Sequence, residues 1–166
     1  MNIIDRISTW VGKGVAWLVP VLILELVYDT AARYLFNAPT SWSFDISYML
    51  YGVIFMCGAA MTLQQDKHVR IEIIFGQLPA RARAIIDAIG YLIFFFPAVG
   101  VLIYYGALFA AKSWSLLETS DQSMWQPPIY PFKTVLPVAA ALLFLQGLAE
   151  FVRCIRTIVS GRSAQA

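Results

Sequence analysis

The chain has 166 residues, a formal net charge of +2 and a mean hydropathy of +0.69. Apolar residues make up 60% and charged residues 13%, against about 45–50% and about 25% in a typical soluble domain. Because the apolar residues are gathered into long runs, this composition excludes a soluble domain and predicts an all-α integral membrane protein. The basic residues lie at the ends of the runs without forming a continuous basic face, which argues against nucleic acid as a partner.

Four apolar runs predict four transmembrane helices within a single membrane domain, residues 1–166, with spans at about 14–35, 46–63, 85–111 and 135–152. At 1.5 Å per residue, the first span is roughly 33 Å long and the second roughly 27 Å, against a bilayer core of about 30 Å. The third span is long and contains Pro97, so we expect it to be tilted or kinked. No small-residue cleavage site follows the first run, which we interpret as an uncleaved span.

A dense cluster of charge lies between the second and third spans, at about 66–82. The alternation of apolar and charged residues over Val69–Ile73 is typical of a strand, whereas the apolar positions from Ile71 to Leu78 recur with the helical period. A lone strand beside a bilayer would leave its backbone groups unpaired. We therefore favour a short amphipathic helix in the membrane interface, with a new helix starting at Pro79.

The distribution of Lys and Arg predicts the orientation. If both termini are cytoplasmic, nine basic residues lie on that side and three on the other; the nine are Arg6, Lys13, Lys67, Arg70, Arg81, Arg83, Arg153, Arg156 and Arg162. The outer loops are then Phe36–Phe44 and Lys112–Lys133. The second loop is rich in aromatic residues and proline, so we expect an outer aromatic belt on an extended, polyproline-like path.

Glu25, Asp29 and Arg33 follow one another at intervals of four on one face of the first span. Glu25 lies near the middle of that span, where a charged carboxylate costs roughly 2.5–3.5 kcal/mol, so it should face protein or water or be protonated. It is either a proton or cation site, or a buried carboxylate hydrogen-bonded to a neighbouring subunit, with Asp29 paired to Arg33.

The residues give no support for a catalytic, cofactor or metal site. A haem between helices usually takes two histidines and a zinc site takes several N or S ligands, whereas His68 is the single histidine. Cys57 and Cys154 lie far apart in apolar surroundings and are expected to be small buried hydrophobes. In the second outer loop, Glu118 and Asp121 form either a docking surface for a soluble partner or a solvated loop.

Several short motifs follow one another along the chain in a recognisable order. The first span closes with Arg33–Pro39, and Trp42, Asp45 and Tyr48 open the second, which contains Gly58–Ala60; there follow His68–Glu72, Glu118–Ser120, the proline-rich loop, Lys133 and Leu136–Pro137. This order and spacing resembles the small, Q-type membrane subunit of tripartite ATP-independent periplasmic (TRAP) transporters. The resemblance covers about Trp10–Arg153.

The resemblance implies a transporter of three parts: a soluble periplasmic substrate-binding protein, a large multi-span membrane subunit that moves substrate and sodium by an elevator motion, and this small subunit. The chain would then be a non-catalytic scaffold in the bacterial inner membrane, surrounded by lipids, that helps to import small organic acids. Its outer loops would help to receive the binding protein. We expect structural or subunit contacts, and no chemistry, from Arg33, Trp42, Asp45, His68, Arg70 and Glu72.

Two alternatives come from other classes of protein. A small proton-coupled exporter that works alone also has four spans and a membrane carboxylate in the first, which Glu25 would supply. A redox membrane enzyme or cytochrome subunit would need cofactor ligands, and a single histidine makes haem a poor fit.

Overall fold

The computed structural model describes residues 3–64 and 79–160. Within these ranges the chain is helical, apart from short loops and one isolated bridge; the helices are α1 (Ile3–Ala16), α2 (Leu18–Leu35), α3 (Ser43–Gln64), α5 (Ala80–Gly90), the π-helical η1 (Tyr91–Phe95), α6 (Phe96–Leu116) and α7 (Tyr130–Ser160). Four stretches are long and apolar enough to cross a membrane. The expected all-α protein with four spanning helices is therefore confirmed.

The first spanning stretch is longer than the apolar run and is interrupted once. It extends over Ile3–Leu35, with the break between α1 and α2 at Trp17. Pro20 accounts for the break, because it has no N–H for the carbonyl of Ala16 and its ring crowds that carbonyl. The N–H of Trp17 instead donates to the carbonyl oxygen of Gly14, at 3.3 Å.

The third stretch is distorted before Pro97, where a kink was expected. Pro97 cannot donate to the carbonyl of Ile93, and the preceding turn is π-helical from Tyr91 to Phe95. The N–H of Phe96 donates to the carbonyl oxygen of Tyr91, five residues earlier, as a π-helix requires. At the start of the third stretch, Pro79 has an extended conformation and α5 begins at the next residue. The remainder of the expected interfacial segment lies outside the described residues.

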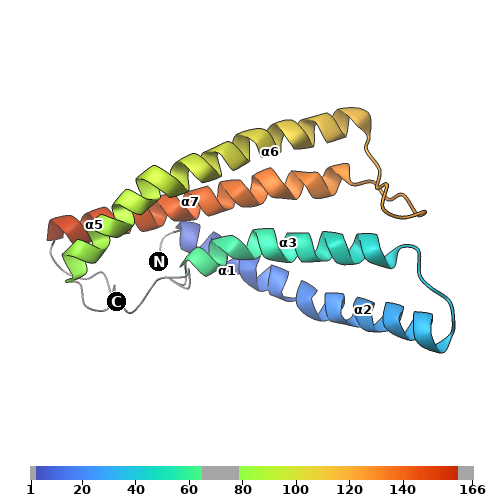
Figure 1. Cartoon of the computed structure of the whole chain (residues 1–166). Coiled ribbons are helices and arrows are strands. Elements are labelled where there is room, and N and C mark those ends of the chain that lie inside the picture. Colours follow the sequence, from blue (N-terminus) through green and yellow to red (C-terminus); the bar gives the residue numbers. More distant parts are fainter. Residues whose placement is uncertain (1–2, 65–78, 161–166) are drawn as a thin grey trace.

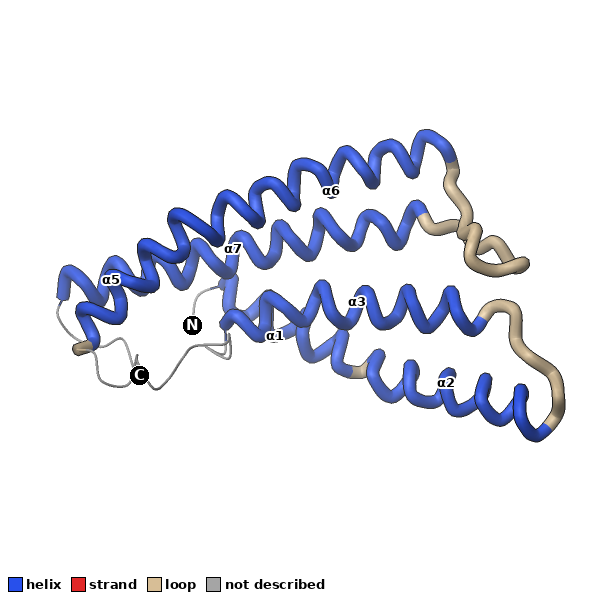
Figure 2. Tube along the Cα trace, in the orientation of Figure 1, coloured by secondary structure: helices blue, strands red, loops and turns tan. Residues whose placement is uncertain are grey.

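The helices form two groups that lie side by side and diverge toward one end (Figures 1 and 2). One group is α1, α2 and α3; the other is α5, η1, α6 and α7. Helix α7 is the central element, since it contacts α1, α3, α5 and α6. One third of its most apolar stretch is buried (33%), against 6% for the stretch that contains α6. The outer faces of α2 and α6 are thus left exposed.

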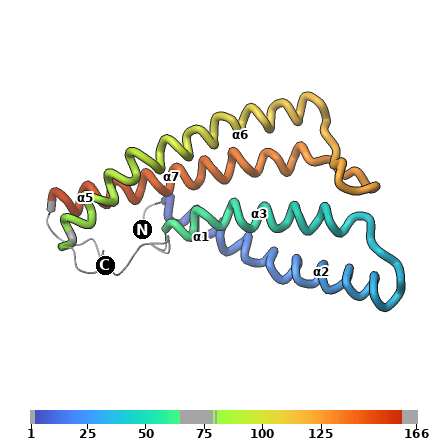
Figure 3. Tube along the Cα trace, in the orientation of Figure 1, coloured from blue at the N-terminus to red at the C-terminus, as the bar shows by residue number. Residues whose placement is uncertain are grey.

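Both loops that join described helices lie at the same end of the molecule (Figure 3). The loop between α6 and α7 differs from the extended path expected from its prolines. It closes into a hairpin, with a bridge between Thr119 and Pro128 and a 2.8 Å hydrogen bond from the N–H of Ser120 to the carbonyl of Pro127. Side-chain bonds to α3, described below, hold this shape and could not be foreseen from local composition.

Candidate functional site

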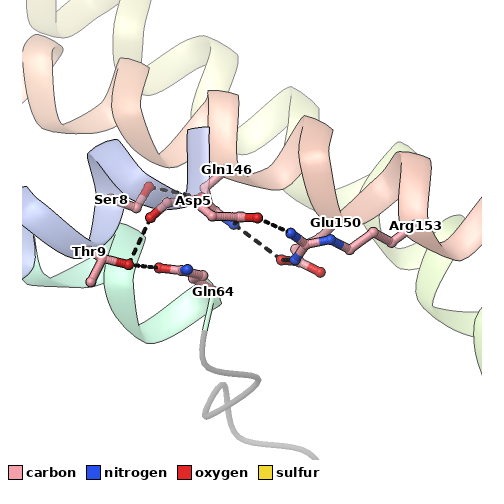
Figure 4. Close-up of polar contacts among 7 residues, drawn as sticks. All are labelled: Asp5, Ser8, Thr9, Gln64, Gln146, Glu150 and Arg153. Carbon is pink, nitrogen blue, oxygen red and sulfur yellow. Dashed lines mark hydrogen bonds and ion pairs between the residues drawn. The ribbon is translucent and has the colours of Figure 1, made fainter. Parts of the chain in front are cut away.

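Polar side chains join α1 to α7 within otherwise apolar helices (Figure 4). We call this group the α1–α7 cluster; its members are Asp5, Ser8, Gln146, Glu150 and Arg153. The guanidinium of Arg153 donates to both Asp5 and Glu150. Since Asp5 lies in α1 and Arg153 in α7, this ion pair joins the first and the last helix of the bundle.

Gln146 is the centre of the α1–α7 cluster. It is fully buried (0% exposed), and burying an amide without partners would be costly. Its Nε2 donates to Asp5 and to Glu150, at 3.1 Å each, and its Oε1 accepts a 2.8 Å hydrogen bond from the hydroxyl of Ser8. The side chain is thus well satisfied, and it links two carboxylates that belong to different helices.

Helix α1 is also fixed to α3. The hydroxyl of Thr9 lies 3.0 Å from Oε1 of Gln64 and 2.7 Å from the carbonyl oxygen of Asp5. One turn further along, Gly12 faces Met61 so closely that an added Cβ would lie 2.7 Å from the Cβ of Met61. The absence of a side chain at residue 12 therefore allows α1 and α3 to approach.

Glu25 of α2 is buried against the first two turns of α3. The hydroxyl of Ser47 donates to its Oε2 at 2.5 Å, and the hydroxyl of Ser43 donates to its Oε1. Both of these partners belong to the same chain, whereas the structural interpretation expected a partner in a neighbouring subunit. Ser43 is the first residue of α3, so Glu25 lies beside the N-terminus of α3. The positive end of the α3 dipole favours a carboxylate there.

The loop after α2 turns back along that helix. Arg33 pairs with Asp29 at 3.0 Å, as expected from their spacing, and the hydroxyl of Thr40 donates to the same carboxylate. Trp42 stacks on Tyr28 with 5.9 Å between the ring centroids. These contacts fix the short connection that leads into α3.

A second polar connection joins the two groups of helices at the loop end. The buried carboxylate of Asp45, in the first turn of α3, accepts hydrogen bonds from two hydroxyls of the α6–α7 loop. Ser120 donates at 2.5 Å to one oxygen, and Ser123 donates to the other. We call Asp45, Ser120 and Ser123 the Asp45 latch.

The base of the α6–α7 loop is held by an ion pair. Nζ of Lys133 lies 2.6 Å from Oε2 of Glu118. The hydrogen bond from Lys133 lowers the pKa of Glu118 below its usual value, so this carboxylate is charged at neutral pH. Beside it, Nε1 of Trp114 donates to Thr134 at 2.9 Å.

A groove of about 620 Å³ lies between α3 and the α6–α7 hairpin. Its walls are mainly apolar, and aromatic side chains among them include Tyr48, Tyr51, Phe55, Phe109 and Phe132; the charged residues of the lining are Asp45, Glu118, Asp121 and Lys133. Within its lining, Phe132 approaches Gly52 so closely that an added Cβ would lie 2.6 Å from the ring. The Asp45 latch crosses the groove at its loop end.

The expected site residues are distributed over several contacts rather than gathered in one place. Asp45 joins two groups of helices, Glu118 pairs with Lys133 in the first turn of α7, and Arg33 and Trp42 fix the α2–α3 connection. Asp121 is exposed and accepts a 2.8 Å hydrogen bond from Gln122. His68, Arg70 and Glu72 lie outside the described residues, so their expected contacts stay predictions.

Sequence reasoning did not find the α1–α7 cluster. Its signal is nevertheless present, because Gln146, Glu150 and Arg153 recur at i, i+4 and i+7 on one face of an apolar helix. Such a polar stripe in a membrane helix must face protein rather than lipid. The serines that bond to Glu25 and Asp45 carry no comparable signal, because serine is common at helix starts and in loops.

Comparison with known proteins places the chain in a family. Residues 22–157 match the family of "Tripartite ATP-independent periplasmic transporters, DctQ component". The chain is also 22% identical over 149 residues to the sialic acid TRAP transporter small permease protein SiaQ of Vibrio cholerae, an alignment that covers 89% of this chain and 82% of the relative. The family match covers most of the chain and includes Glu25, the Asp45 latch and the polar stripe of α7. The chain therefore belongs to the DctQ family, the small membrane subunits of TRAP transporters.

Proposed function

We propose that the chain is the immobile scaffold of a sodium-driven, binding-protein-dependent importer in the bacterial inner membrane. In this proposal it anchors a large elevator-type subunit, takes no part in chemistry, and helps a periplasmic binding protein to dock. Family membership supports the role of small permease subunit. The division of labour between subunits is the part that we infer.

The observation that carries the proposal is the pair of polar connections between the two groups of helices. The α1–α7 cluster joins them toward one end, and the Asp45 latch joins them at the loop end. A two-part bundle fixed near both ends resists relative displacement of its halves, because separation would leave buried carboxylates without their hydrogen bonds. An elevator needs such a fixed part against which its moving domain slides.

The membrane carboxylates of the described spans serve structural contacts, which favours a scaffold over a carrier. Glu25 bonds two serines of α3, Asp29 pairs with Arg33, and Asp45 bonds the α6–α7 loop. A proton carrier needs a carboxylate that changes partners during transport. In the described residues Glu25 joins α2 to α3, and Asp45 joins α3 to the α6–α7 loop.

The exposed faces of α2 and α6 suit contact with lipid and with a large membrane subunit. Large apolar side chains on these faces, among them Leu24, Tyr28, Tyr104, Tyr105 and Leu108, are more than half exposed. We propose that part of this surface is covered by the large subunit and the remainder by lipid tails. The Lys and Arg bias supports cytoplasmic termini, with the α6–α7 loop in the periplasm.

We propose a small organic acid as the imported substrate. The relative from Vibrio cholerae is named for sialic acid, which is a carboxylic acid. Recognition of the acid would lie in the binding protein and the large subunit, because Lys133, the cation beside the α6–α7 loop, is already paired with Glu118.

Reconstitution of transport in liposomes tests the proposal. The tagged chain is purified in mild detergent, its co-purifying membrane proteins are identified by mass spectrometry, and uptake is measured with and without the binding protein and a sodium gradient. We expect a large multi-span partner in equal amount, with uptake only when all parts and sodium are present. Transport by this chain alone, driven by a proton gradient and lost in Glu25→Gln, would instead establish the small exporter.

A further inference from the structure

We infer that Asp45 is a positioning residue for docking: the Asp45 latch holds the tip of the α6–α7 loop, Asp121–Trp125, in the conformation that contacts the soluble binding protein. The inference rests on the proposed function and adds the residues responsible. The observations that carry it are the burial of the latch, the backbone of the loop and the exposed apolar side chains at its tip.

The latch is buried although it joins a helix to a loop. Asp45 is 2% exposed and Ser120 is 4% exposed, and both oxygens of the carboxylate accept a hydroxyl hydrogen bond from the loop. Hydrogen bonds to a charged group contribute more than neutral ones, and more still where water is excluded. The loop is therefore fixed to α3 close to its tip as well as to its own helices at its base.

The loop backbone supports the same conclusion. Gln126, which follows the tip, has a positive φ of 47°, a region that residues with a side chain seldom adopt. Such conformations persist where tertiary contacts impose them. The N–H of Gln126 donates to the carbonyl of Ser123 at 3.3 Å, and the Ser123 hydroxyl donates to Asp45, so the backbone beside the tip is connected to α3 through the latch.

The tip presents apolar surface to water. Five consecutive polar residues, Thr119–Ser123, precede Met124, which indicates an aqueous surrounding rather than the bilayer core. Met124 is nevertheless 96% exposed and Trp125 is 51% exposed. Methionine and tryptophan are enriched where a protein surface is covered by a partner. A soluble protein that approaches this end of the bundle is the occupant that the arrangement suits.

Preorganisation explains why a carboxylate would be buried for this purpose. Binding by a mobile loop loses affinity because the loop must be ordered in the complex, whereas a fixed loop avoids that cost. Loss of the latch should thus weaken docking without changing the transport step that follows. The half-saturating concentration of binding protein and the rate at saturation report these two effects separately.

The test uses the complete transporter in liposomes, with uptake measured against the concentration of substrate-loaded binding protein. The variants are Asp45→Ala, Asp45→Asn and the double variant Ser120→Ala/Ser123→Ala. The matched control is Ser115→Ala, which removes an exposed hydroxyl that bonds only within its own helix, to the carbonyl of Lys112 at 2.7 Å. Co-purification of the large subunit shows whether each variant assembles.

We expect Asp45→Ala and the double serine variant to raise the half-saturating concentration of binding protein roughly tenfold, with the rate at saturation preserved within about twofold. Asp45→Asn, whose amide can still bond both serines, should show a smaller rise, and Ser115→Ala none. An unchanged half-saturating concentration in both disruptive variants would overturn the inference, and so would a loss confined to the rate at saturation.

The double variant Met124→Ser/Trp125→Ser tests the tip without touching the latch, and remains informative if Asp45→Ala does not assemble. We expect the same rise in half-saturating concentration. If this variant instead leaves docking unchanged and weakens retention of the complex in lipid, the tip contacts the membrane and the inference is wrong. If the wild-type complex lacks a large subunit or ignores the binding protein, the proposed function itself fails.

Discussion

Arg153 donates a hydrogen bond to Asp5, although 148 residues separate them. The carboxylate of Asp5 is almost completely buried, and the guanidinium of Arg153 also reaches Glu150. The first and last helices of the bundle are thereby joined through charged groups in an apolar protein. This contact and the Asp45 latch connect the two groups of helices at two places, as the proposed scaffold role requires.

Arg153→Ala should destabilise the bundle. It removes the cation from a buried carboxylate, which typically costs about 3–5 kcal/mol, and because the Arg153 side chain is 33% exposed we expect about 2 kcal/mol. Arg33→Ala is the control, since it breaks a pair within one helix whose cation is more than half exposed, and exposed ion pairs contribute little to stability. The thermal midpoint in detergent measures both, and equal midpoints for the two variants would contradict a structural role for the α1–α7 cluster.

Gly12→Ala should weaken the packing of α1 on α3. The new Cβ would lie 2.7 Å from the Cβ of Met61, which cannot move away by side-chain rotation, so we expect a loss of about 1–3 kcal/mol. Gly14→Ala is the matched control on the same helix. A Cβ at Gly14 meets no atom within 4 Å, so the higher helix propensity of alanine should leave stability equal or improved by up to about 1 kcal/mol. Comparable losses in both variants would argue against a close approach of α1 and α3 at Gly12.

Glu25→Gln should leave uptake by the assembled transporter within about twofold of the wild type, because the amide can bond both Ser43 and Ser47. Glu25→Leu should lower stability by about 1–3 kcal/mol, since it removes the acceptor of the buried Ser43 hydroxyl. Uptake per assembled complex and the thermal midpoint separate the two effects. Loss of uptake in Glu25→Gln with normal assembly would indicate that Glu25 carries a proton.

The Glu118–Lys133 ion pair predicts a pH dependence of the loop. Because folding lowers the pKa of Glu118, the pair stabilises the loop above the unfolded-state pKa of about 4.3, and the contribution is lost as pH falls through the lower folded-state pKa. Limited proteolysis of the loop should differ between wild type and Glu118→Gln by a constant factor from about pH 5.5 to 8. The difference should shrink only below about pH 4. If wild type and Glu118→Gln were already cleaved at the same rate near neutral pH, the ion pair between Glu118 and Lys133 would not be what stabilises the loop.

Much of the fold could be predicted from the sequence, because apolar run length decides which segments can cross a bilayer. The pairing of Asp29 with Arg33 was also predictable, since residues four apart on a helix are neighbours. The break at Trp17 follows from Pro20 by the same local rules. These features depend on residues that are close in sequence.

The tertiary connections could not be predicted in the same way. Ser120 and Asp45 are 75 residues apart, and Ser8 and Gln146 are 138 apart. Which face of each helix contacts which neighbour depends on how all the helices pack together. Local patterns in a single sequence do not reveal that packing. Only one of the two interpretations of Glu25 gave it a hydrogen-bond partner, in another subunit, whereas the loop after α2 brings Ser43 and Ser47 of the same chain to it.

A distance measurement within this chain during transport tests the scaffold role most directly. Spin labels are attached at Tyr34→Cys on α2 and Leu116→Cys on α6, which are 77% and 65% exposed, in a background with Cys57 and Cys154 replaced by Ala. Pulsed electron resonance then compares the reconstituted transporter at rest with the transporter supplied with sodium, substrate and binding protein. A label pair that spans the moving part of the large subunit is the positive control. If the chain is a fixed scaffold, the α2–α6 distance distribution stays the same while the control pair shifts; a shift of the α2–α6 distribution in step with the control would show that the chain moves with the large subunit.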